Sequence, residues 1–400
     1  RALSLTPRQR IVGLREMARL EASGEDPERE KSLRELYQYQ GIDTCAGDGL
    51  CSIACPVDID TGRMMKVLRG REMGATGTKV ADLVAEHFGA VSTTTRLSLS
   101  AAHLAHTALG TSVMQGLTSG VRKLSGSRIP LWNPFMPTSC RLPAKSVNIG
   151  SESPRVVYFP SCSSRTMGPA RGDPEREALP DKFEGLLRKA GYTVVYPSDC
   201  DRLCCGMPFE SKGAFSQADA KLRMTEQALV EASRNGQNPV VFDTSPCTYR
   251  MKQNLEADLR LFDITEFIHD FLMPRLAIRK LPEVVALHPT CSTRKMGLVD
   301  KLQNIAETCA AQVIVPEEVS CCGWAGDKGF TVPELNESAV RNLRPSLSDD
   351  CVAGYSTGRT CEIGLSFHSG RYYRSIAYLL DRCSEPKEPL SERELDERGT

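Results

Sequence analysis

Two short stretches, LCCGMPFESKG at residues 203–213 and SCCGWAGDKGF at residues 320–330, decide how this chain is organised. Each holds two adjacent cysteines followed by a glycine, and each lies between two further cysteines. The flanking stretches also correspond in order: VVYFPSC (156–162) matches VVALHPTC (284–291), and FDTSPC (242–247) matches YSTGRTC (355–361). Three matches in the same order predict an internal duplication with copies of about 100 residues.

The duplicated region alternates short β-branched runs with helical patterns that end in glycine. The runs RVVYFP, TVVYP and PVVFDT predict strands, and KFEGLLRKAG between the first two predicts a helix, so we expect an α/β sheet with parallel strands. Loops at the carboxyl ends of parallel strands converge on one edge of the sheet. The cysteines of each copy should therefore meet there: Cys162, Cys204, Cys205 and Cys247 in the first, and Cys291, Cys321, Cys322 and Cys361 in the second.

Thiolates grouped in this way favour iron–sulphur clusters, zinc or copper(I). The alternative is that the cysteines are buried small residues left over from the duplication. A disulfide scaffold fits poorly, because disulfide-dense proteins are usually short and secreted, whereas this chain has 400 residues, sixteen cysteines and no secretory signal pattern. Metal binding or redox chemistry therefore explains the cysteine count better.

A different cysteine pattern occurs near the N-terminus, where residues 44–62 read TCAGDGLCSIACPVDIDTG. We call this segment the cysteine loop. Cys45, Cys51 and Cys55, which precedes a proline, fit the bacterial ferredoxin run if Asp48 takes the place of the second cysteine. Asp48 would then bind iron weakly, leave a 3Fe–4S cluster, or be an ordinary loop residue. In two-cluster ferredoxins the last cysteine ligates the other cluster, so we expect a partner run upstream of Arg1.

The regions around these motifs predict the domain boundaries. Residues 1–124 show helical periodicity without a strand pattern, with turns near residues 74–77 and 93–95 and a core-facing helix over residues 97–117. Residues 125–154 form a proline-rich linker. The two repeats span residues 155–280 and 281–385, and a charged tail covers residues 386–400. No stretch is apolar enough for a transmembrane helix. The formal net charge of zero argues against a nucleic-acid partner.

The repeats CCGMPFESKG and CCGWAGDKGF resemble the CCG cysteine-rich domain of heterodisulfide reductase and of the iron–sulphur subunits of glycolate oxidase and anaerobic glycerol-3-phosphate dehydrogenase. With LTPRQRIVGLREMARL and the cysteine loop, the chain is most similar to the C-terminal iron–sulphur part of FAD-linked D-2-hydroxyacid dehydrogenases of the D-lactate and D-2-hydroxyglutarate type. The resemblance implies a helical ferredoxin-like domain followed by two α/β repeats packed as a pseudo-two-fold pair. It implies cluster ligation by the eleven cysteines named above.

The resemblance also implies an electron-transfer function. Electrons from FAD, bound in an upstream domain of the same parent chain, would pass through 4Fe–4S clusters to a quinone, cytochrome or flavoprotein, in the cytoplasm or at the inner face of the membrane. The enzyme would be a D-2-hydroxyacid dehydrogenase whose FAD and substrate sites lie outside this fragment. Heterodisulfide reductase relatives have a further cysteine where this chain has Arg250 and Gly364, which leaves ordinary clusters or zinc in one repeat open. The alternatives are a disulfide-reducing catalytic domain and a zinc-bound docking module.

Overall fold

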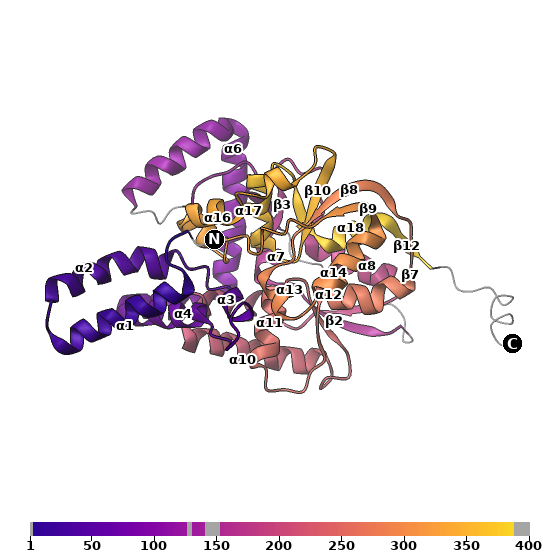
Figure 1. Cartoon of the computed structure of the whole chain (residues 1–400). Helices are drawn as coiled ribbons and strands as arrows, with labels where there is room; N and C mark the ends of the chain where they lie inside the picture. The colour runs from indigo at the N-terminus through magenta and orange to yellow at the C-terminus, as the bar shows by residue number, and fades with distance from the viewer. Residues whose placement is uncertain (1–2, 126–129, 141–152, 388–400) are drawn as a thin grey trace, which may run out of the picture.

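The computed structural model describes residues 3–125, 130–140 and 153–387. An arm of N-terminal helices projects from an α/β body that contains both repeats (Figure 1). The helices of the arm and the one that follows it are α1 (Pro7–Ser23), α2 (Pro27–Tyr37), α3 (Leu50–Ile53), α4 (Thr61–Glu72), α5 (Gly74–Glu86) and α6 (Phe88–Leu124). A π-helical turn, η1 (Gln38–Asp43), joins α2 to the cysteine loop.

Local sequence explains where α1 begins and ends. Thr6 caps the helix through a capping box with Gln9, and Pro7 fills the first helical position, where no backbone donor is needed. Gly24 ends the helix in the left-handed conformation with φ of 63°. The turn expected at residues 93–95 is wrong: α6 runs through them, and its break lies at Gly110, whose φ is 78°.

The core-facing orientation expected for residues 97–117 holds for one face of the helix only, the face that carries His106 and Met114. Only Phe88, Ser92, His106 and Met114 are buried in α6, whereas Leu97 and Leu104 are 67% and 70% exposed. Its alanine and leucine positions favour helical geometry, but the body covers only one side of the helix. None of the helices in the described ranges is long and apolar enough to cross a membrane.

Part of the expected linker is packed against the body. Strand β1 (Pro137–Ser139) pairs antiparallel with β3 (Met167–Ala170) of the first repeat. Trp132 donates a hydrogen bond from Nε1 to Nδ1 of His106 on α6, at 2.8 Å, and Phe135 packs edge-on against Tyr372. Residues 141–152 of the linker and residues 388–400 of the expected tail lie outside the described residues.

The two repeats have the same sheet. Repeat 1 has the strand order β4-β2-β5-β6 and repeat 2 has the order β9-β8-β10-β11, with every neighbouring pair parallel. The strands are β2 (Arg155–Phe159), β4 (Thr193–Val195), β5 (Val240–Phe242), β6 (Leu261–Asp263), β8 (Leu281–Leu287), β9 (Ala310–Ile314), β10 (Cys351–Ser356) and β11 (Tyr373–Ser375). The duplication and the parallel α/β architecture predicted from the sequence are therefore confirmed.

Helices and short edge strands complete each repeat. In repeat 1 these are α7 (Cys162–Thr166), α8 (Leu179–Lys189), α9 (Met207–Glu210), α10 (Phe215–Ala232), α11 (Ser245–Asn254), α12 (Ile264–Phe267), η3 (Ile268–Leu272) and β7 (Leu276–Ile278). In repeat 2 these are α13 (Cys291–Lys295), α14 (Val299–Cys309), α15 (Lys328–Thr331), α16 (Pro333–Val340), α17 (Arg359–Ser369), α18 (Ile376–Cys383) and β12 (Ser384–Pro386).

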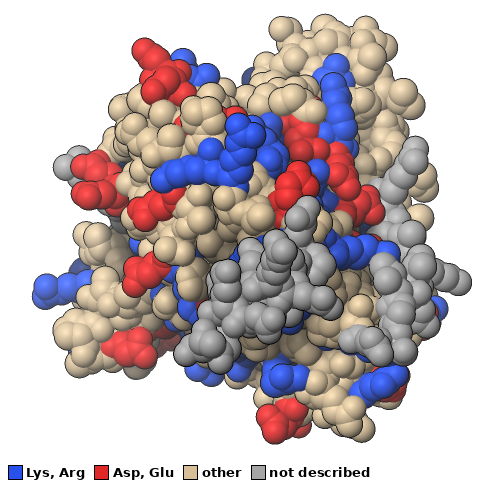
Figure 2. Space-filling model, turned by 90° about the vertical axis from the view of Figure 1, so that its right-hand side faces the viewer, with Lys and Arg blue, Asp and Glu red and all other residues tan. Residues whose placement is uncertain are grey.

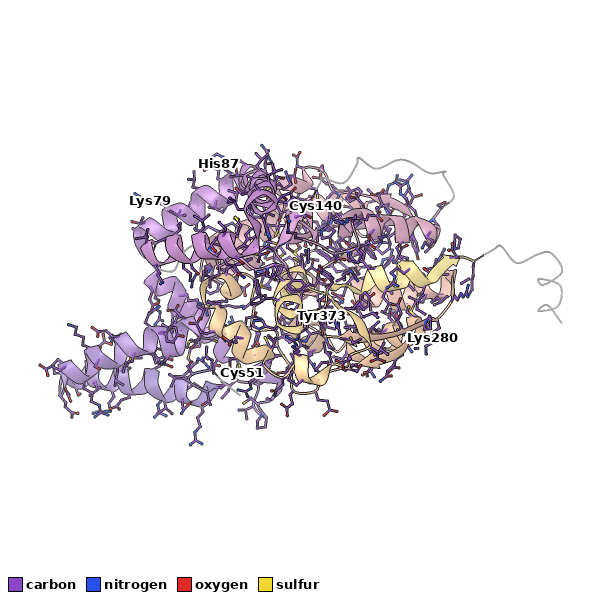
Figure 3. All side chains as sticks on the ribbon, turned by 90° about the horizontal axis from the view of Figure 1, so that it is seen from above. Cys51, Lys79, His87, Cys140, Lys280 and Tyr373 are labelled. Carbon is purple, nitrogen blue, oxygen red and sulfur yellow. The ribbon has the colours of Figure 1, made fainter. Side chains whose placement is uncertain are left out.

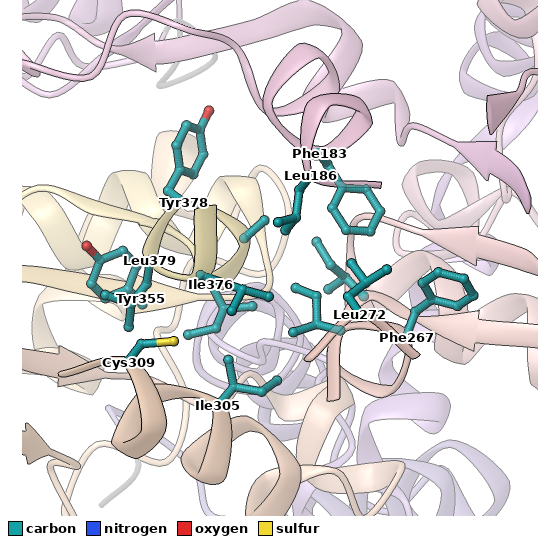
Figure 4. Close-up of a cluster of buried hydrophobic side chains, with 14 of the residues drawn as sticks. Phe183, Leu186, Phe267, Leu272, Ile305, Cys309, Tyr355, Ile376, Tyr378 and Leu379 are labelled. Carbon is teal, nitrogen blue, oxygen red and sulfur yellow. The ribbon is translucent and has the colours of Figure 1, made fainter. Parts of the chain in front are cut away.

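Reciprocal contacts relate the repeats by a pseudo-two-fold arrangement. The equivalent strands β7 and β12 pair antiparallel with each other. Helix α8 packs on α18, and its counterpart α14 packs on the turn η3, which is the counterpart of α18. Equivalent elements that contact each other reciprocally are the mark of an isologous interface. The side chains of this interface form one continuous core, in which Phe267 and Leu272 of repeat 1 face Ile305 and Ile376 of repeat 2 (Figure 4).

The helical region docks on repeat 1 through a close backbone contact. A Cβ atom added to Gly70 of α4 would lie 2.7 Å from the carbonyl oxygen of Gly213, so only two glycines allow this approach. Lys66 of α4 forms a salt bridge with Glu210 at 2.7 Å beside it. On the face shown in Figure 2, basic and acidic side chains lie next to one another, in line with the zero net charge.

Candidate metal centres

The four expected cysteines of repeat 1 come together at the carboxyl edge of its sheet. Cys162 follows β2, Cys204 and Cys205 follow β4, and Cys247 follows β5. The thiol of Cys162 hydrogen-bonds with that of Cys204, and the sulphur atoms of Cys205 and Cys247 are 3.3 Å apart. Cys204 and Cys205 also hydrogen-bond with each other. We call this group the repeat 1 centre.

Repeat 2 brings its four cysteines to the equivalent place. Cys291 follows β8, Cys321 and Cys322 follow β9, and Cys361 follows β10. The thiols of Cys321, Cys322 and Cys361 are hydrogen-bonded in series. Cys291 lies near enough to Cys321 for the two thiols to interact electrostatically. This group is the repeat 2 centre.

The glycine of each adjacent-cysteine motif explains how two neighbouring thiols point to one place. Gly206 and Gly323 have φ of 88° and 68°, a region that residues with a Cβ atom rarely adopt. Their amides donate to the sulphur atoms of Cys204 and Cys321, at 3.4 and 3.3 Å. A Cβ atom at these positions would lie 2.3 Å from the carbonyl oxygen of Ala218 and 2.6 Å from that of Leu335. Glycine is therefore required for two reasons, the positive φ and the lack of space for a Cβ atom.

The first cysteine of each centre is placed by a capped helical turn. Ser161 and Thr290 cap α7 and α13 by accepting from the amides of Ser164 and Thr293, so Cys162 and Cys291 become the first helical residues. The caps also tie the loops together, because the Thr244 hydroxyl donates to Ser161 at 2.7 Å. The same tie in repeat 2 joins Thr290 to Thr357 at 3.2 Å.

Burial makes the two centres unfavourable places for unpaired thiolates. The hydrogen bond with Cys204 and burial raise the pKa of Cys162, and the hydrogen bond with Cys322 and burial raise the pKa of Cys321. Burial likewise raises the pKa of Cys291. A bound metal ion reverses this preference, since it holds a coordinating thiol in the deprotonated form. Buried groups of four thiols with backbone donors to sulphur therefore fit a thiolate-ligated metal or iron–sulphur cluster.

The thiols of each centre contact one another instead of surrounding a common point. Across the described ranges, no three or more His, Cys, Asp or Glu side chains stand in the arrangement of a single metal-ion site. None of the eleven expected ligand cysteines forms a disulfide. Metal binding would therefore separate the hydrogen-bonded sulphur atoms.

Both repeats correspond to a known domain. Residues 156–252 and 285–362 match the family model of the CCG cysteine-rich domain. Each repeat thus matches a domain family that is usually iron–sulphur related, and we refer to the two repeats as the CCG domains. A search of curated proteins finds no match to this chain.

Hydrogen bonds between hydroxyl-bearing residues join the two CCG centres. Thr293, two residues after Cys291, donates to Ser245, two residues before Cys247, at 3.1 Å. The backbone amide of Ser245 donates to the carbonyl oxygen of Thr357 at 3.0 Å. Helices α11 and α13, which carry Cys247 and Cys291, therefore pack directly together. The sequence did not indicate that the two centres would adjoin.

The cysteine loop docks on the second CCG domain (Figure 3 labels Cys51 at this junction). Cys45 is buried among the N-terminal helices, whereas Cys51 and Cys55 are partly exposed. The Cys51 sulphur lies 3.3 Å from the hydroxyl oxygen of Thr61 and 3.8 Å from a carboxylate oxygen of Asp60. No hydrogen bond joins the sulphur atoms of Cys45, Cys51 and Cys55 in the described residues. Asp48 instead hydrogen-bonds with Cys321 of the repeat 2 centre.

Several charged residues near the centres have structural partners. Lys212 forms an ion pair with Asp327 of the other CCG domain, and Lys328 donates to the carbonyl oxygen of Asp43 at 2.8 Å. Arg359 bonds Glu362 at 2.9 Å. Lys212 is exposed, whereas Lys328 and Arg359 are buried, and Arg359 also donates to the carbonyl oxygen of Gly168 in the first repeat.

A buried arginine near the repeat 1 centre escaped the sequence analysis. Arg165, three residues after Cys162, donates to the Cys200 sulphur at 3.0 Å and to the carbonyl oxygen of Leu203 at 2.7 Å. Its counterpart is Arg294, three residues after Cys291, so aligning CSSR with CSTR would have found both. Cys200 thus adjoins its centre, whereas Cys351 starts β10 at the opposite edge of the sheet from Cys361.

The position of the missing fifth cysteine is filled in both CCG domains. In repeat 1 it is Arg250, which donates to the carbonyl oxygen of Cys205 at 2.7 Å and bonds Glu210 at 2.7 Å. In repeat 2 it is Gly364, where a Cβ atom would lie 2.5 Å from the Trp324 ring. Neither domain can place a fifth thiol there without rearranging its own core.

Proposed function

We propose that this chain is the iron–sulphur electron-transfer part of an FAD-dependent D-2-hydroxyacid dehydrogenase, of the D-lactate or D-2-hydroxyglutarate type. The observation that carries the proposal is the continuity of three cysteine groups. The cysteine loop contacts the repeat 2 centre through Asp48, and the repeat 2 centre adjoins the repeat 1 centre through Ser245 and Thr293. Iron–sulphur clusters held by these groups would supply one-electron oxidation and reduction.

The residues of the chain would hold and tune the clusters. The thiols of both CCG centres are ligands, and the amides of Gly206, Gly323 and Trp324 donate to sulphur atoms at 3.3 to 3.4 Å. Such donors stabilise negative charge on sulphur and so raise a cluster's reduction potential. Burial of Cys204, Cys205 and Cys322 keeps water away from the same atoms.

The oxidation of the hydroxyacid belongs to a part of the parent protein outside this chain. Reduced FAD bound there would donate electrons to the clusters, and an external quinone, cytochrome or flavoprotein would accept them. In this proposal no side chain of the described residues acts as an acid, base or nucleophile on the substrate. Exposed apolar residues on α6 and charged groups on the body offer two kinds of surface to an acceptor. Binding measurements would identify the acceptor's class.

Metal analysis after anaerobic purification tests this function. We expect iron with a matching amount of acid-labile sulphide, together with an electron paramagnetic resonance signal that appears or disappears on reduction. A Cys383→Ser variant serves as the control, because Cys383 lies outside both centres, near Cys309. Zinc without iron would contradict the proposal and support a docking module. Disulfide reduction by the isolated chain would support the catalytic alternative.

A further inference from the structure

The contact between the cysteine loop and the second CCG domain assigns a role to Asp48. We propose that its carboxylate is an oxygen ligand of the repeat 2 centre, so that this centre takes donors from two domains while the repeat 1 centre is built from thiols alone. The inference rests on the proposed function, because it concerns a metal that the centre holds. It differs from the sequence expectation, which placed Asp48 in a cluster of the loop itself.

The argument starts from an asymmetry between the two centres. In repeat 1, the first thiol of the adjacent pair, Cys204, has Cys162 as its hydrogen-bond partner. In repeat 2 the equivalent thiol is Cys321, and Asp48 takes the partner's place. Cys291, the counterpart of Cys162, hydrogen-bonds with Ser292. The Asp48 carboxylate thus stands beside the four thiols of the repeat 2 centre as a fifth donor, where the repeat 1 centre has thiols alone.

The loop backbone is shaped to bring Asp48 to this point. Gly47 and Gly49 on either side of it have φ of 64° and 71°. A Cβ atom at Gly49 would lie 1.9 Å from Nζ of Lys295, one turn after Cys291 in α13. Lys295 also lies 3.7 Å from the Asp60 carboxylate. One lysine therefore packs on the residue next to Asp48 and pairs with the loop at a second point.

Two further contacts fix η1, the segment just before the loop, on the domain. Lys328, in the segment after Cys322, bonds the carbonyl oxygen of Asp43 at 2.8 Å. The hydroxyl of Tyr39 donates to Glu334 at 2.6 Å. Together with the Lys295–Asp60 pair they hold the chain on both sides of Asp48, so docking sets the position of its carboxylate.

The ligand properties of a carboxylate predict how readily the repeat 2 centre exchanges metal. A carboxylate is a harder ligand than a thiolate and is displaced from iron more readily. The metal atom bound by Asp48 should therefore be the most easily exchanged one in the chain. The repeat 1 centre, whose neighbours are thiols and the apolar Phe88 and Phe209, has no such atom.

Substitutions at Asp48 test the inference on the anaerobically purified chain. The variants are Asp48→Asn, which removes the charge, and Asp48→Glu, which keeps it. The control is Asp58→Asn, an exposed acid of the same loop whose φ of 55° asparagine tolerates well. The readouts are metal and sulphide per chain, release of metal to a chelator, and the resonance signals assigned with Cys205→Ser, Cys322→Ser and Cys51→Ser.

We expect Asp48→Asn to speed metal release at least tenfold and to alter only the signal that Cys322→Ser abolishes. Asp48→Glu should restore slow release, and Asp58→Asn should match the wild type. If Asp48→Asn instead alters the signal that Cys51→Ser abolishes, Asp48 belongs to the loop's own cluster and the inference is wrong. Metal release from Asp48→Asn at the wild-type rate would also overturn it. A wild-type chain that holds zinc refutes the iron–sulphur function. The rate of zinc release from Asp48→Asn, compared with the wild type, would still show whether Asp48 is a metal ligand.

Discussion

The two CCG domains share a scaffold but differ in what covers their centres. Both place four cysteines after equivalent strands, and both use a glycine with positive φ to aim an amide at sulphur. The repeat 1 centre is covered by apolar side chains of α5 and α6, with Phe88 packed at Cys204. The repeat 2 centre is covered by the polar cysteine loop, with Asp48 at Cys321. Duplication kept the thiols, and the helical region outside it made the two centres different.

Buried side chains within the repeats also diverge. Repeat 1 has Phe159 before its first cysteine loop, where repeat 2 has His288. At the end of the third strand, repeat 1 has the buried Asp243, which accepts from Tyr158 at 2.9 Å, and repeat 2 has Ser356. A duplicated fold therefore gives two environments for one ligand set, and each difference can be tested by exchanging the residues.

The largest expected effect is the loss of one whole centre. Cys205→Ser should remove the metal signal of repeat 1 and leave that of repeat 2, and Cys322→Ser should do the opposite, because each thiol has partners only in its own centre. Resonance spectra and metal content of both variants measure this. Loss of both signals in either variant would mean that the centres form one cooperative unit.

A smaller effect is expected for the two motif glycines. Gly206→Ala and Gly323→Ala should each lower the stability of their domain by about 2–5 kcal/mol, from backbone strain and from overlap with a carbonyl oxygen. Gly297→Ala is a matched control, because its φ is 68° and a Cβ atom there meets nothing within 4 Å. It should cost only about 1–2 kcal/mol of strain. Urea unfolding measures the three, and equal losses would refute the steric argument.

His288 should make the stability of repeat 2 depend on pH. Burial lowers the pKa of His288 from 6.5 to about 3. Below pH 6.5 the unfolded chain therefore binds a proton at this histidine, whereas the folded chain does not. Stability is then lost as the pH falls, by about 2 kcal/mol between pH 7 and 5 from this group. His288→Phe, which copies Phe159, should remove that part of the slope in urea unfolding. A variant with the wild-type slope would show that other groups cause it.

The smallest effect is expected at the edge of the loop's docking site. Tyr39→Phe removes the hydrogen bond to Glu334 and should weaken docking by about 1 kcal/mol. Amide hydrogen exchange in residues 38–55 should then become about fivefold faster, with repeat 1 unchanged. Unchanged amide hydrogen exchange in the loop would indicate that Lys295 and Lys328 provide the free energy of docking.

The strands and the placement of the thiols were predictable because they depend on local patterns and on the geometry of parallel sheets. Cys162 and Cys291 follow β-branched runs, and loops after such strands must converge. The contact between Asp48 and Cys321 was not predictable, since it joins residues far apart in sequence through domain docking. The exposed side of α6 was missed for a related reason: its periodicity shows an apolar face, but not whether another domain covers it.

The docking of the cysteine loop on repeat 2 sets an order for making the protein. The loop leaves the ribosome before repeat 2, because Cys321, Lys328 and Glu334 follow some 270 to 290 residues later. At about 5–20 residues per second, the loop waits roughly 15 to 60 s for its partner. During synthesis the loop is thus present before repeat 2, and the arrival of repeat 2 brings Cys321 to Asp48. Repeat 2 therefore completes the surroundings of a loop that is synthesised before it.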